Sequence, residues 1–298
     1  MNILFLRYIM AKLCRSSDFK YLVPVLFILF FSFGCVSTIT GNFAEDLSYA
    51  IINNNDLETV KTGGPAYLLM IDSLLYDDPE NESLLRAAAN LYTAYTDIYV
   101  ENKARAAKMT DKAMSYALRA VCESWSDTCS FRELDFDSFM KVLRNIDDKD
   151  CVPSLYTLGV TWASWIQAHK DDWNAVAEIA RVEALMTHIV KLQESYHDGG
   201  AHLYLGILAT LLPPALGGKP EQGRRHFERA LEISGTKNLM VKVIYARQYA
   251  RMIFDRKLHD RLLNSVLGAD PEVKGYSLLN ILAQKKAKDL LKSADDFF

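Results

Sequence analysis

Hydrophobic residues recur at intervals of three and four along most of this chain, the spacing that places them on one face of an α-helix. The alternation of apolar and polar residues that predicts β-strands is not sustained anywhere in the sequence, and Asn-Gly hairpin turns do not occur. The pattern therefore predicts an all-α fold. The clearest helical runs are 84–95, 106–121, 155–167, 173–192, 202–212, 224–233, 240–254 and 261–267.

Loop signals lie between these runs, because glycine and proline are disfavoured in the interior of a helix. We expect short loops between consecutive helices, which makes neighbouring helices antiparallel. The expected breaks are at Gly63-Gly64-Pro65, at Asp78-Pro79, at Pro213-Pro214 with Gly217-Gly218, and at Asp270-Pro271.

The helices also recur in pairs. Tetratricopeptide repeats are helix pairs of about 34 residues, in which small and large apolar residues occupy fixed offsets. Residues 240–273 fit this frame, with Val243, Ala246 and Ala250 at the packing offsets of the first helix, and weaker matches occur in three earlier segments. Full signatures are missing, since His202 stands where tryptophan is usual. We expect stacked antiparallel helix pairs in degenerate tetratricopeptide-like repeats; an irregular helical bundle is the alternative.

The repeats predict a single helical-repeat domain over residues 43–298. Residues 122–151 resemble an insertion between two units, with a loop and a short helix near 136–146 that Asp135 would cap. Residues 274–298 predict a last amphipathic helix, apolar on one face and rich in lysine on the other. A stack of helix pairs needs a polar-backed cap at its open end, so we assign this segment as the C-terminal capping helix.

The first 34 residues have the layout of a bacterial secretion signal. A basic stretch ends at Lys20 and an uninterrupted apolar run follows over 21–31, which is short for a bilayer span of about 20 residues. The run closes with Ser32-Phe33-Gly34-Cys35. This resembles the lipobox of bacterial lipoproteins, although Phe33 is larger than the residue usual at its position.

We therefore expect residues 1–34 to be a lipoprotein signal peptide, Cys35 to receive the lipid, and residues 35–42 to form a lipidated linker. The mature chain would lie in the periplasm, anchored by its lipid to the inner or the outer membrane. The alternative is an uncleaved N-terminal anchor in which Cys35 is not modified.

The charge of the mature chain argues against a nucleic-acid partner. The sequence has 34 basic and 37 acidic residues, of which the leader holds four and one. The mature chain keeps 30 bases and 36 acids, a net charge of −6, and it has no basic block. Binding to a phosphate backbone requires such a block, so nucleic acid is not an expected partner.

Beyond Cys35 the mature chain has three cysteines, Cys122, Cys129 and Cys151. In an oxidising compartment two of them could form a disulfide, with three possible pairings. Buried thiols are an alternative of similar weight. A zinc site would need a fourth ligand, and no histidine lies in this stretch.

Motifs of catalysis are missing from the sequence. It has no HExxH zinc helix, no GxSxG nucleophile elbow and no phosphate-binding loop with the spacing of a Walker motif. His197, Asp198 and His202 are the best candidates for a metal site, but a loop position for the first two and a packing position for His202 are favoured. We therefore expect no enzyme activity, no metal and no cofactor.

A curved stack of helix pairs presents its first helices on the concave side, where a ligand or a protein partner binds. The repeat frame predicts which residues line this side, and they mix apolar and polar side chains with two arginines. Such a surface would suit a partly apolar ligand with an acidic end. The predicted residues are Arg86, Asn90, Thr93, Tyr156, Val160, Leu203, Ile207, Ile244, Gln248 and Arg251.

The chain resembles the T components associated with tripartite ATP-independent periplasmic (TRAP) transporters. The resemblance lies in the lipobox-like leader, in the degenerate helix pairs and in two stretches of sequence, Leu203-Tyr-Leu-Gly-Ile-Leu-Ala and the later Gly-Arg-Arg-His-Phe-Glu-Arg-Ala-Leu-Glu. The resemblance covers the chain from about residue 40 to its end. It implies a periplasmic lipoprotein that forms a homotrimer and associates with the solute-binding P subunit of the transporter. It also implies a small organic acid or a more hydrophobic molecule as the ligand.

A second function of a different class fits the same pattern. Many tetratricopeptide proteins are scaffolds that hold a peptide or a protein in the concave groove, and a general envelope scaffold remains the alternative. A neighbouring gene for a solute-binding subunit would favour the transporter role.

Overall fold

The computed structural model describes residues 46–298, and within this range it contains helices and no strand. The all-α prediction is confirmed. The signal peptide, Cys35 and the linker lie outside the described residues. The helices are α4 (Leu57–Asp77), α5 (Glu82–Tyr99), α6 (Lys103–Ser124), α7 (Phe136–Asn145), α8 (Val152–Ala168), α9 (Trp173–Ala177), α10 (Ile179–Gln193), α11 (Gly200–Ala209), α12 (Pro220–Ser234), α13 (Met240–Tyr245), α14 (Arg256–Leu267), α15 (Ser277–Lys292) and α16 (Ala294–Phe297).

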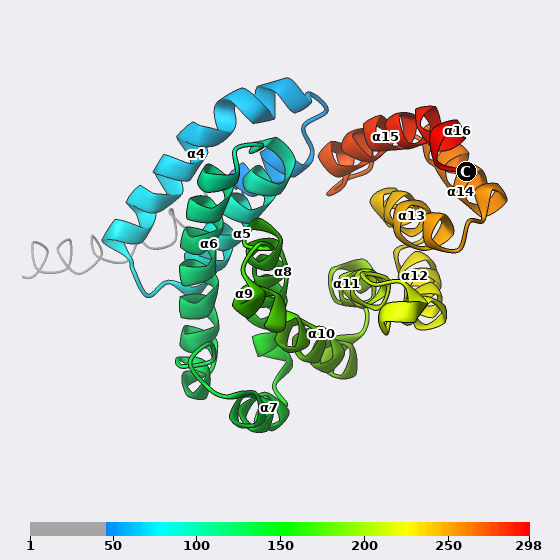
Figure 1. Ribbon diagram of the computed structural model, residues 1–298. Helices are drawn as coiled ribbons and strands as arrows, with labels where there is room; N and C mark the ends of the chain where they lie inside the picture. The colour runs from blue at the N-terminus through cyan, green and yellow to red at the C-terminus, as the bar shows by residue number, and fades with distance from the viewer. Residues whose placement is uncertain (1–45) are drawn as a thin grey trace, which may run out of the picture. The chain divides into compact units, whose positions relative to one another are not determined.

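The helices of residues 47–298 pack in successive pairs within one unit. The pairs are α5 with α6, α8 with α10, α11 with α12, and α13 with α14. Figure 1 shows α5, α8, α11 and α13 along the inner side of an arc and their partners along its outer side. Helix pairs pack against each other as the repeat pattern predicts; their descent from tetratricopeptide repeats stays a prediction.

The expected break at Gly63-Gly64-Pro65 is wrong, because α4 runs through it from Leu57 to Asp77. A proline in a helix leaves the carbonyl four residues earlier without its amide donor. Here that carbonyl belongs to Lys61, and it accepts a hydrogen bond from the hydroxyl of Tyr95 at 3.3 Å. Gly64 lets α5 approach this closely, since a Cβ at Gly64 would lie 2.4 Å from the Tyr95 ring.

Two other helical runs depart from regular helices. The run 173–192 is divided at Glu178 into α9 and α10. The Glu178 carboxylate accepts a 2.5 Å hydrogen bond from the Trp162 indole and lies 3.6 Å from Arg132. In the run 240–254, α13 continues as a π-helix over Ala246–Ala250. Such wide turns occur mostly where a helix meets a functional or packing demand.

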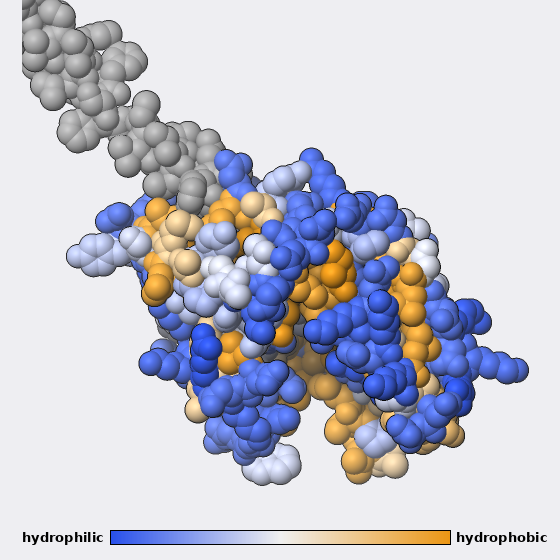
Figure 2. Space-filling model, turned by 90° about the horizontal axis from the view of Figure 1, so that it is seen from above, coloured by the Kyte–Doolittle hydropathy of each residue, from blue (hydrophilic) through white to orange (hydrophobic). Residues whose placement is uncertain are grey.

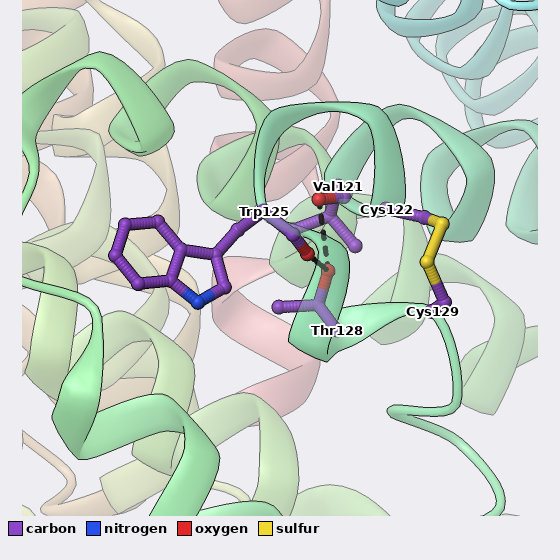
Figure 3. Close-up of a disulfide and its surroundings, with 5 residues drawn as sticks. All are labelled: Val121, Cys122, Trp125, Thr128 and Cys129. Atoms are coloured by element: carbon purple, nitrogen blue, oxygen red, sulfur yellow. Dashed lines mark hydrogen bonds between the residues drawn. A yellow bond between two sulfur atoms is a disulfide. The ribbon is translucent and has the colours of Figure 1, made fainter.

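The segment 122–151 is held by a disulfide between Cys122 and Cys129, and Cys151 is a buried thiol. Thr128 braces the same turn, because its hydroxyl donates to the carbonyls of Val121 at 2.8 Å and Trp125 at 2.6 Å (Figure 3). The short helix α7 follows. Asp135 caps it by accepting a 3.0 Å hydrogen bond from the amide of Ser138, as the sequence predicts.

Reduction of the disulfide should destabilise the folded chain. The bridge joins residues seven positions apart, and closing so short a loop in the unfolded state is worth about 2 kcal/mol of folding free energy. We expect a reductant to lower the urea midpoint of the native protein. The Cys122→Ser/Cys129→Ser double variant should start at the lower midpoint and not respond to reductant. Equal midpoints for the oxidised and reduced native protein would contradict the prediction.

The two ends of the helical array meet. The amide of Gly275 donates to the side chain of Asn53 at 2.7 Å, and Asn55 donates to Glu272 at 3.0 Å. Leu57 also packs against the hydrophobic cluster formed by α13, α14 and α15. Figure 1 accordingly shows the start of α15 beside the chain that precedes α4. The first and the last described helices are therefore joined by direct contacts.

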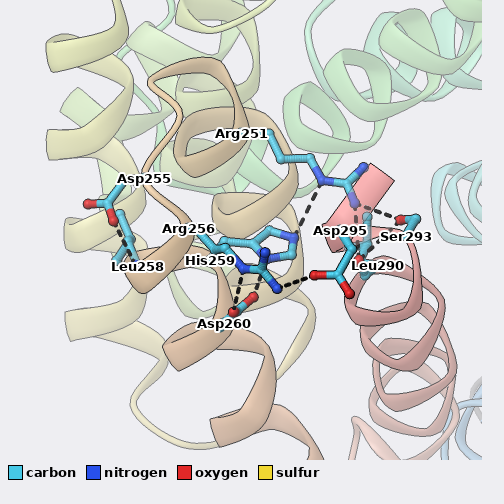
Figure 4. Close-up of polar contacts among 9 residues, drawn as sticks. All are labelled: Arg251, Asp255, Arg256, Leu258, His259, Asp260, Leu290, Ser293 and Asp295. Atoms are coloured by element: carbon cyan, nitrogen blue, oxygen red, sulfur yellow. Dashed lines mark hydrogen bonds and ion pairs between the residues drawn. The ribbon is translucent and has the colours of Figure 1, made fainter. Parts of the chain in front are cut away.

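The C-terminal segment predicted as a capping helix forms α15 and α16. Within α15, the side chains of Leu278 and Leu282 are buried, whereas those of Lys285 and Lys288 are exposed. Arg251 ties α15 to the preceding helices (Figure 4), since its guanidinium donates to the Leu290 carbonyl at 3.1 Å and to the Ser293 hydroxyl at 2.8 Å.

Candidate functional site

A row of polar contacts joins the inner helices α5 and α8. Residue numbers rise together along the two helices, so α5 and α8 run parallel, as the first helices of consecutive pairs do in a stack of helix hairpins. On α8 the contacts recur every three or four residues, and on α5 they skip one turn between Glu82 and Asn90. From the first turn to the last, the contacts are Glu82–Ser154 at 2.5 Å, Asn90–Thr157 at 3.3 Å, Thr93–Thr161 at 3.1 Å and Asp97–Ser164 at 2.6 Å.

An aromatic cluster lies where α8 faces the segment that leads into α11. The Tyr156 ring stacks on His197 with a centroid separation of 5.1 Å and an interplanar angle of 23°. Tyr196 and Tyr204 meet the same ring edge-on, at 5.4 Å and 6.4 Å. Gly200 makes room for it, because a Cβ there would lie 2.2 Å from the Tyr156 hydroxyl oxygen. These edge-on contacts are the favoured geometry for aromatic rings.

A left-handed turn presents His197 to this cluster. His197, Asp198 and Gly199 all have positive φ, at 49°, 50° and 79°, and a non-glycine residue in this region costs on the order of 1 kcal/mol or more. Asp198 holds the turn, because its carboxylate accepts hydrogen bonds from the Tyr276 hydroxyl at 2.5 Å and from Lys237 at 3.2 Å. Burial works to raise the pKa of Asp198, but these two hydrogen bonds outweigh it and keep the pKa below its usual value.

The inner side chains are reached by solvent and yet surrounded by protein. Asp97 and His197 are exposed side chains, but burial raises the pKa of the Asp97 carboxyl group and lowers that of the His197 imidazole. Burial also raises the pKa of the half-buried Tyr156 and Tyr204. Neighbouring protein thus desolvates these groups although solvent still reaches them, and we refer to this group of inner-side residues as the recess. Figure 2 shows hydrophobic side chains gathered in a hollow between polar ones.

Positive charge faces Asp97 across this recess. Burial is the largest cause that lowers the pKa of Lys286 of α15, and the charge of Arg247 is the second. The charge of Asp97 raises the pKa. The charges of Lys286 and Arg247 are therefore close enough to repel each other. The charges of Asp289 and Lys285 also act on Lys286, so charges of both signs surround this amine.

Arg86 of α5 belongs to the same group of residues, since its charge acts on Tyr196. Its Nε atom is fully buried and is the one such side-chain nitrogen or oxygen without a hydrogen-bond partner in residues 46–298. Glu82 lies 3.4 Å from this atom, but the Glu82 carboxylate already accepts a hydrogen bond from Ser154. A carboxylate has about four acceptor sites, so Glu82 can offset the charge of Arg86 while it binds Ser154.

The sequence profile of the TRAP transporter T-component family matches residues 53–298. The chain belongs to this family. The predicted resemblance is thereby confirmed, and a role associated with a TRAP transporter follows from membership. Among curated proteins, none matches the chain.

The structure places the predicted concave residues of this T component in three groups. Arg86 and Tyr156 belong to the recess, and Asn90 belongs to the polar row. Thr93 is buried and bonded to Thr161. The remaining residues are half-buried: Val160 and Gln248, Arg251 in its contacts with α15, and Leu203, Ile207 and Ile244 packed against the C-terminal hydrophobic cluster.

Sequence reasoning did not include Asp97, Tyr196, Tyr204 and Lys286, which share the recess with Arg86 and Tyr156. Tyr204 follows a predicted residue directly, and Gly199-Gly200 marks the turn that presents the aromatic cluster, so a signal existed for part of this set.

His202, a candidate metal ligand in the sequence, lies elsewhere. It is buried and bonds through Nδ1 to His226 at 2.9 Å and through Nε2 to Glu194 at 3.0 Å. Across residues 46–298, the histidine, cysteine and acidic side chains form no group of three or more that could hold a metal ion. Within the same range, none of the helices combines the length and the apolar character needed to span a bilayer.

Proposed function

We propose that this T component binds a small, partly hydrophobic organic acid in the recess between its inner helices and docks the solute-binding P subunit of its transporter. The observation that carries the proposal is the composition of the recess, in which the rings of Tyr156, Tyr196 and Tyr204 occur together with basic side chains. Aromatic and apolar walls with a few placed charges are typical of ligand sites. The absence of a catalytic constellation from the sequence supports binding, and not turnover, as the activity.

The cellular setting is part of the same proposal. Family membership indicates an extracytoplasmic protein associated with the transporter. The leader motif supports lipidation at Cys35 and anchoring at the periplasmic face of a membrane. We further propose that the protein assembles as a homotrimer, as the family resemblance implies. Cys35→Ser should release the chain from membranes into the aqueous phase of a detergent partition.

The docking proposal is tested by purification of the tagged, full-length T component from envelope membranes in mild detergent. Mass spectrometry of the eluate identifies bound protein and, after denaturation, bound small molecules. Recovery of the solute-binding subunit in comparable amount, together with an organic acid, would support the proposal. Recovery of unrelated envelope proteins without a solute-binding subunit or a small molecule would instead favour the scaffold function.

A further inference from the structure

A groove of about 320 Å³ lies between α7 and α10, which pack against each other (Figure 1). Its apolar walls are Phe136, Met140 and Leu143 of α7 and Ala180 and Ala184 of α10. The two alanines keep the α10 wall low. Phe136 raises the α7 wall, because this residue is 44% exposed. The groove is therefore open to solvent and mainly apolar.

Hydrogen bonds at both ends of α7 fix this helix to α10. Before α7, the Arg181 guanidinium donates to the carbonyls of Phe131, at 3.1 Å, and of Leu134. After α7, the Nε2 atom of His188 lies 2.7 Å from the carbonyl oxygen of Ile146. Residue numbers rise together across these contacts, so α7 and α10 run parallel. A groove with walls fixed in this way is preformed, which lowers the entropic cost of binding.

Positive charge gathers at one end of the groove. Arg144 and Lys191 line it there, in the last turns of α7 and α10, and neither forms an ion pair within residues 46–298. Glu183 is the one carboxylate of the lining. His188 adds no charge near neutral pH, because burial, together with the charge of Lys191, lowers its pKa. Two cations against one carboxylate leave the lining with an excess of positive charge.

The exposed acidic residues of α7 and of the loop that follows it do not pair with these cations. None of them forms an ion pair with Arg144 or Lys191, and Asp148 instead accepts a 2.9 Å hydrogen bond from the amide of Asp150 in its own loop. The two cations therefore remain available to a carboxylate from outside the chain. The exposed acidic residues are Asp137, Asp147, Asp148 and Asp150.

The shape of the groove favours a protein segment over a small molecule. Small-molecule sites bury about 70–90% of their ligand, which an open groove of this size does not do. Amphipathic helices, in contrast, lay an apolar face into such grooves and keep the opposite face in solvent. Exposed aromatic residues such as Phe136 are typical anchors of interfaces, and the flexible Met140 side chain can adapt to a partner.

We propose that the groove between α7 and α10 is a docking surface for the solute-binding P subunit. It would receive an apolar helix face of that subunit, with a carboxylate group of the same helix bound by Arg144 and Lys191. The inference rests on the proposed function, which includes docking of this subunit, and names the surface at which the subunit binds.

Binding of the purified solute-binding subunit of the same transporter to the full-length T component in mild detergent tests the inference by calorimetry. The double variant Arg144→Glu/Lys191→Glu should weaken binding by about 10- to 100-fold, because it places like charges opposite each other. The matched control is Arg105→Glu/Lys108→Glu, which makes the same change of charge at two exposed positions of α6. This control should retain the affinity of the native protein.

A second variant tests the apolar walls without a change of charge. Ala184→Phe fills the groove and should also weaken binding by about 10-fold or more, since a partner side chain can no longer enter it. Ala104→Phe, at an exposed position of α6, makes the same substitution outside the groove and should bind as the native protein does. Thermal unfolding of each variant confirms that it is folded.

Hydrogen exchange of the native complex provides a measurement that needs no variant. Amides of residues 136–145 and 179–193 should exchange more slowly when the solute-binding subunit is bound. Binding of the native protein without this protection, or native affinity in either groove variant, would overturn the inference and leave the docking proposal intact. Failure of the native protein to bind the subunit would overturn both.

Discussion

Replacement of Trp162 by alanine is expected to lower the free energy of unfolding by about 3–5 kcal/mol, the range for removing a large aromatic side chain from a packed core. Trp162 is fully buried in α8. Its ring meets Phe139 of α7 edge-on at 6.2 Å, and its indole N–H donates to Glu178 at 2.5 Å. The substitution would leave a cavity beside Phe139 and leave Arg132 as the remaining polar partner of the Glu178 carboxylate. Chemical denaturation followed by circular dichroism measures the loss.

Trp173 provides the matched control, because it is the same residue type with a side chain that is 85% exposed. Trp173→Ala should change the unfolding free energy by less than about 0.5 kcal/mol, as surface substitutions usually do. Similar losses for both variants would mean that Trp162 does not occupy the packed position described.

Asn280→Ala should cost about 2–4 kcal/mol, because it leaves one buried amide and two part-buried carbonyls without their partner, each worth on the order of 1 kcal/mol or more. The Asn280 side chain is fully buried. It accepts from the amide of Leu239 at 2.9 Å and donates to the carbonyls of Lys237 at 2.9 Å and Pro271 at 3.3 Å. These bonds fix α15 to the loop before α13 and to the loop after α14.

Lys285 lies on the same helix with an exposed side chain. Lys285→Ala retains every contact of Asn280 and should leave the unfolding midpoint nearly unchanged. A small effect of Asn280→Ala in the same measurement would indicate that water replaces the lost side chain at all three backbone groups.

The positions of most helices follow from the sequence because burial on one face imposes the spacing of apolar residues. Asp135 is an example of a local signal that suffices to predict the start of a helix. An aspartate at the N-cap position can accept hydrogen bonds from the first amides of the helix without help from distant residues. Pro65 is the opposite case. Whether a proline ends a helix or is accommodated in it depends here on Tyr95, which lies 30 positions later and replaces the missing donor. A local pattern carries no information on such a contact.

The candidate site divides in the same way. Repeat geometry predicts Arg86 and Tyr156 on the inner side because regular helices place their side chains at predictable intervals. Tyr196 and His197 belong instead to an irregular segment whose left-handed residues are set by Asp198, Tyr276 and Lys237. Tyr276 and Lys237 lie far from Asp198 in the chain, so the orientation of His197 toward Tyr156 could not be predicted from local sequence.

Stacks of helix hairpins ordinarily fray from their ends, since each terminal unit has a neighbour on one side only. The contact of Gly275 with Asn53 joins positions 222 residues apart, and Leu57 rests on the last hydrophobic cluster. The terminal helices therefore support each other, and opening at either terminus has to break contacts made by both. This mutual support gives the array the cooperativity of a globular protein despite its modular construction.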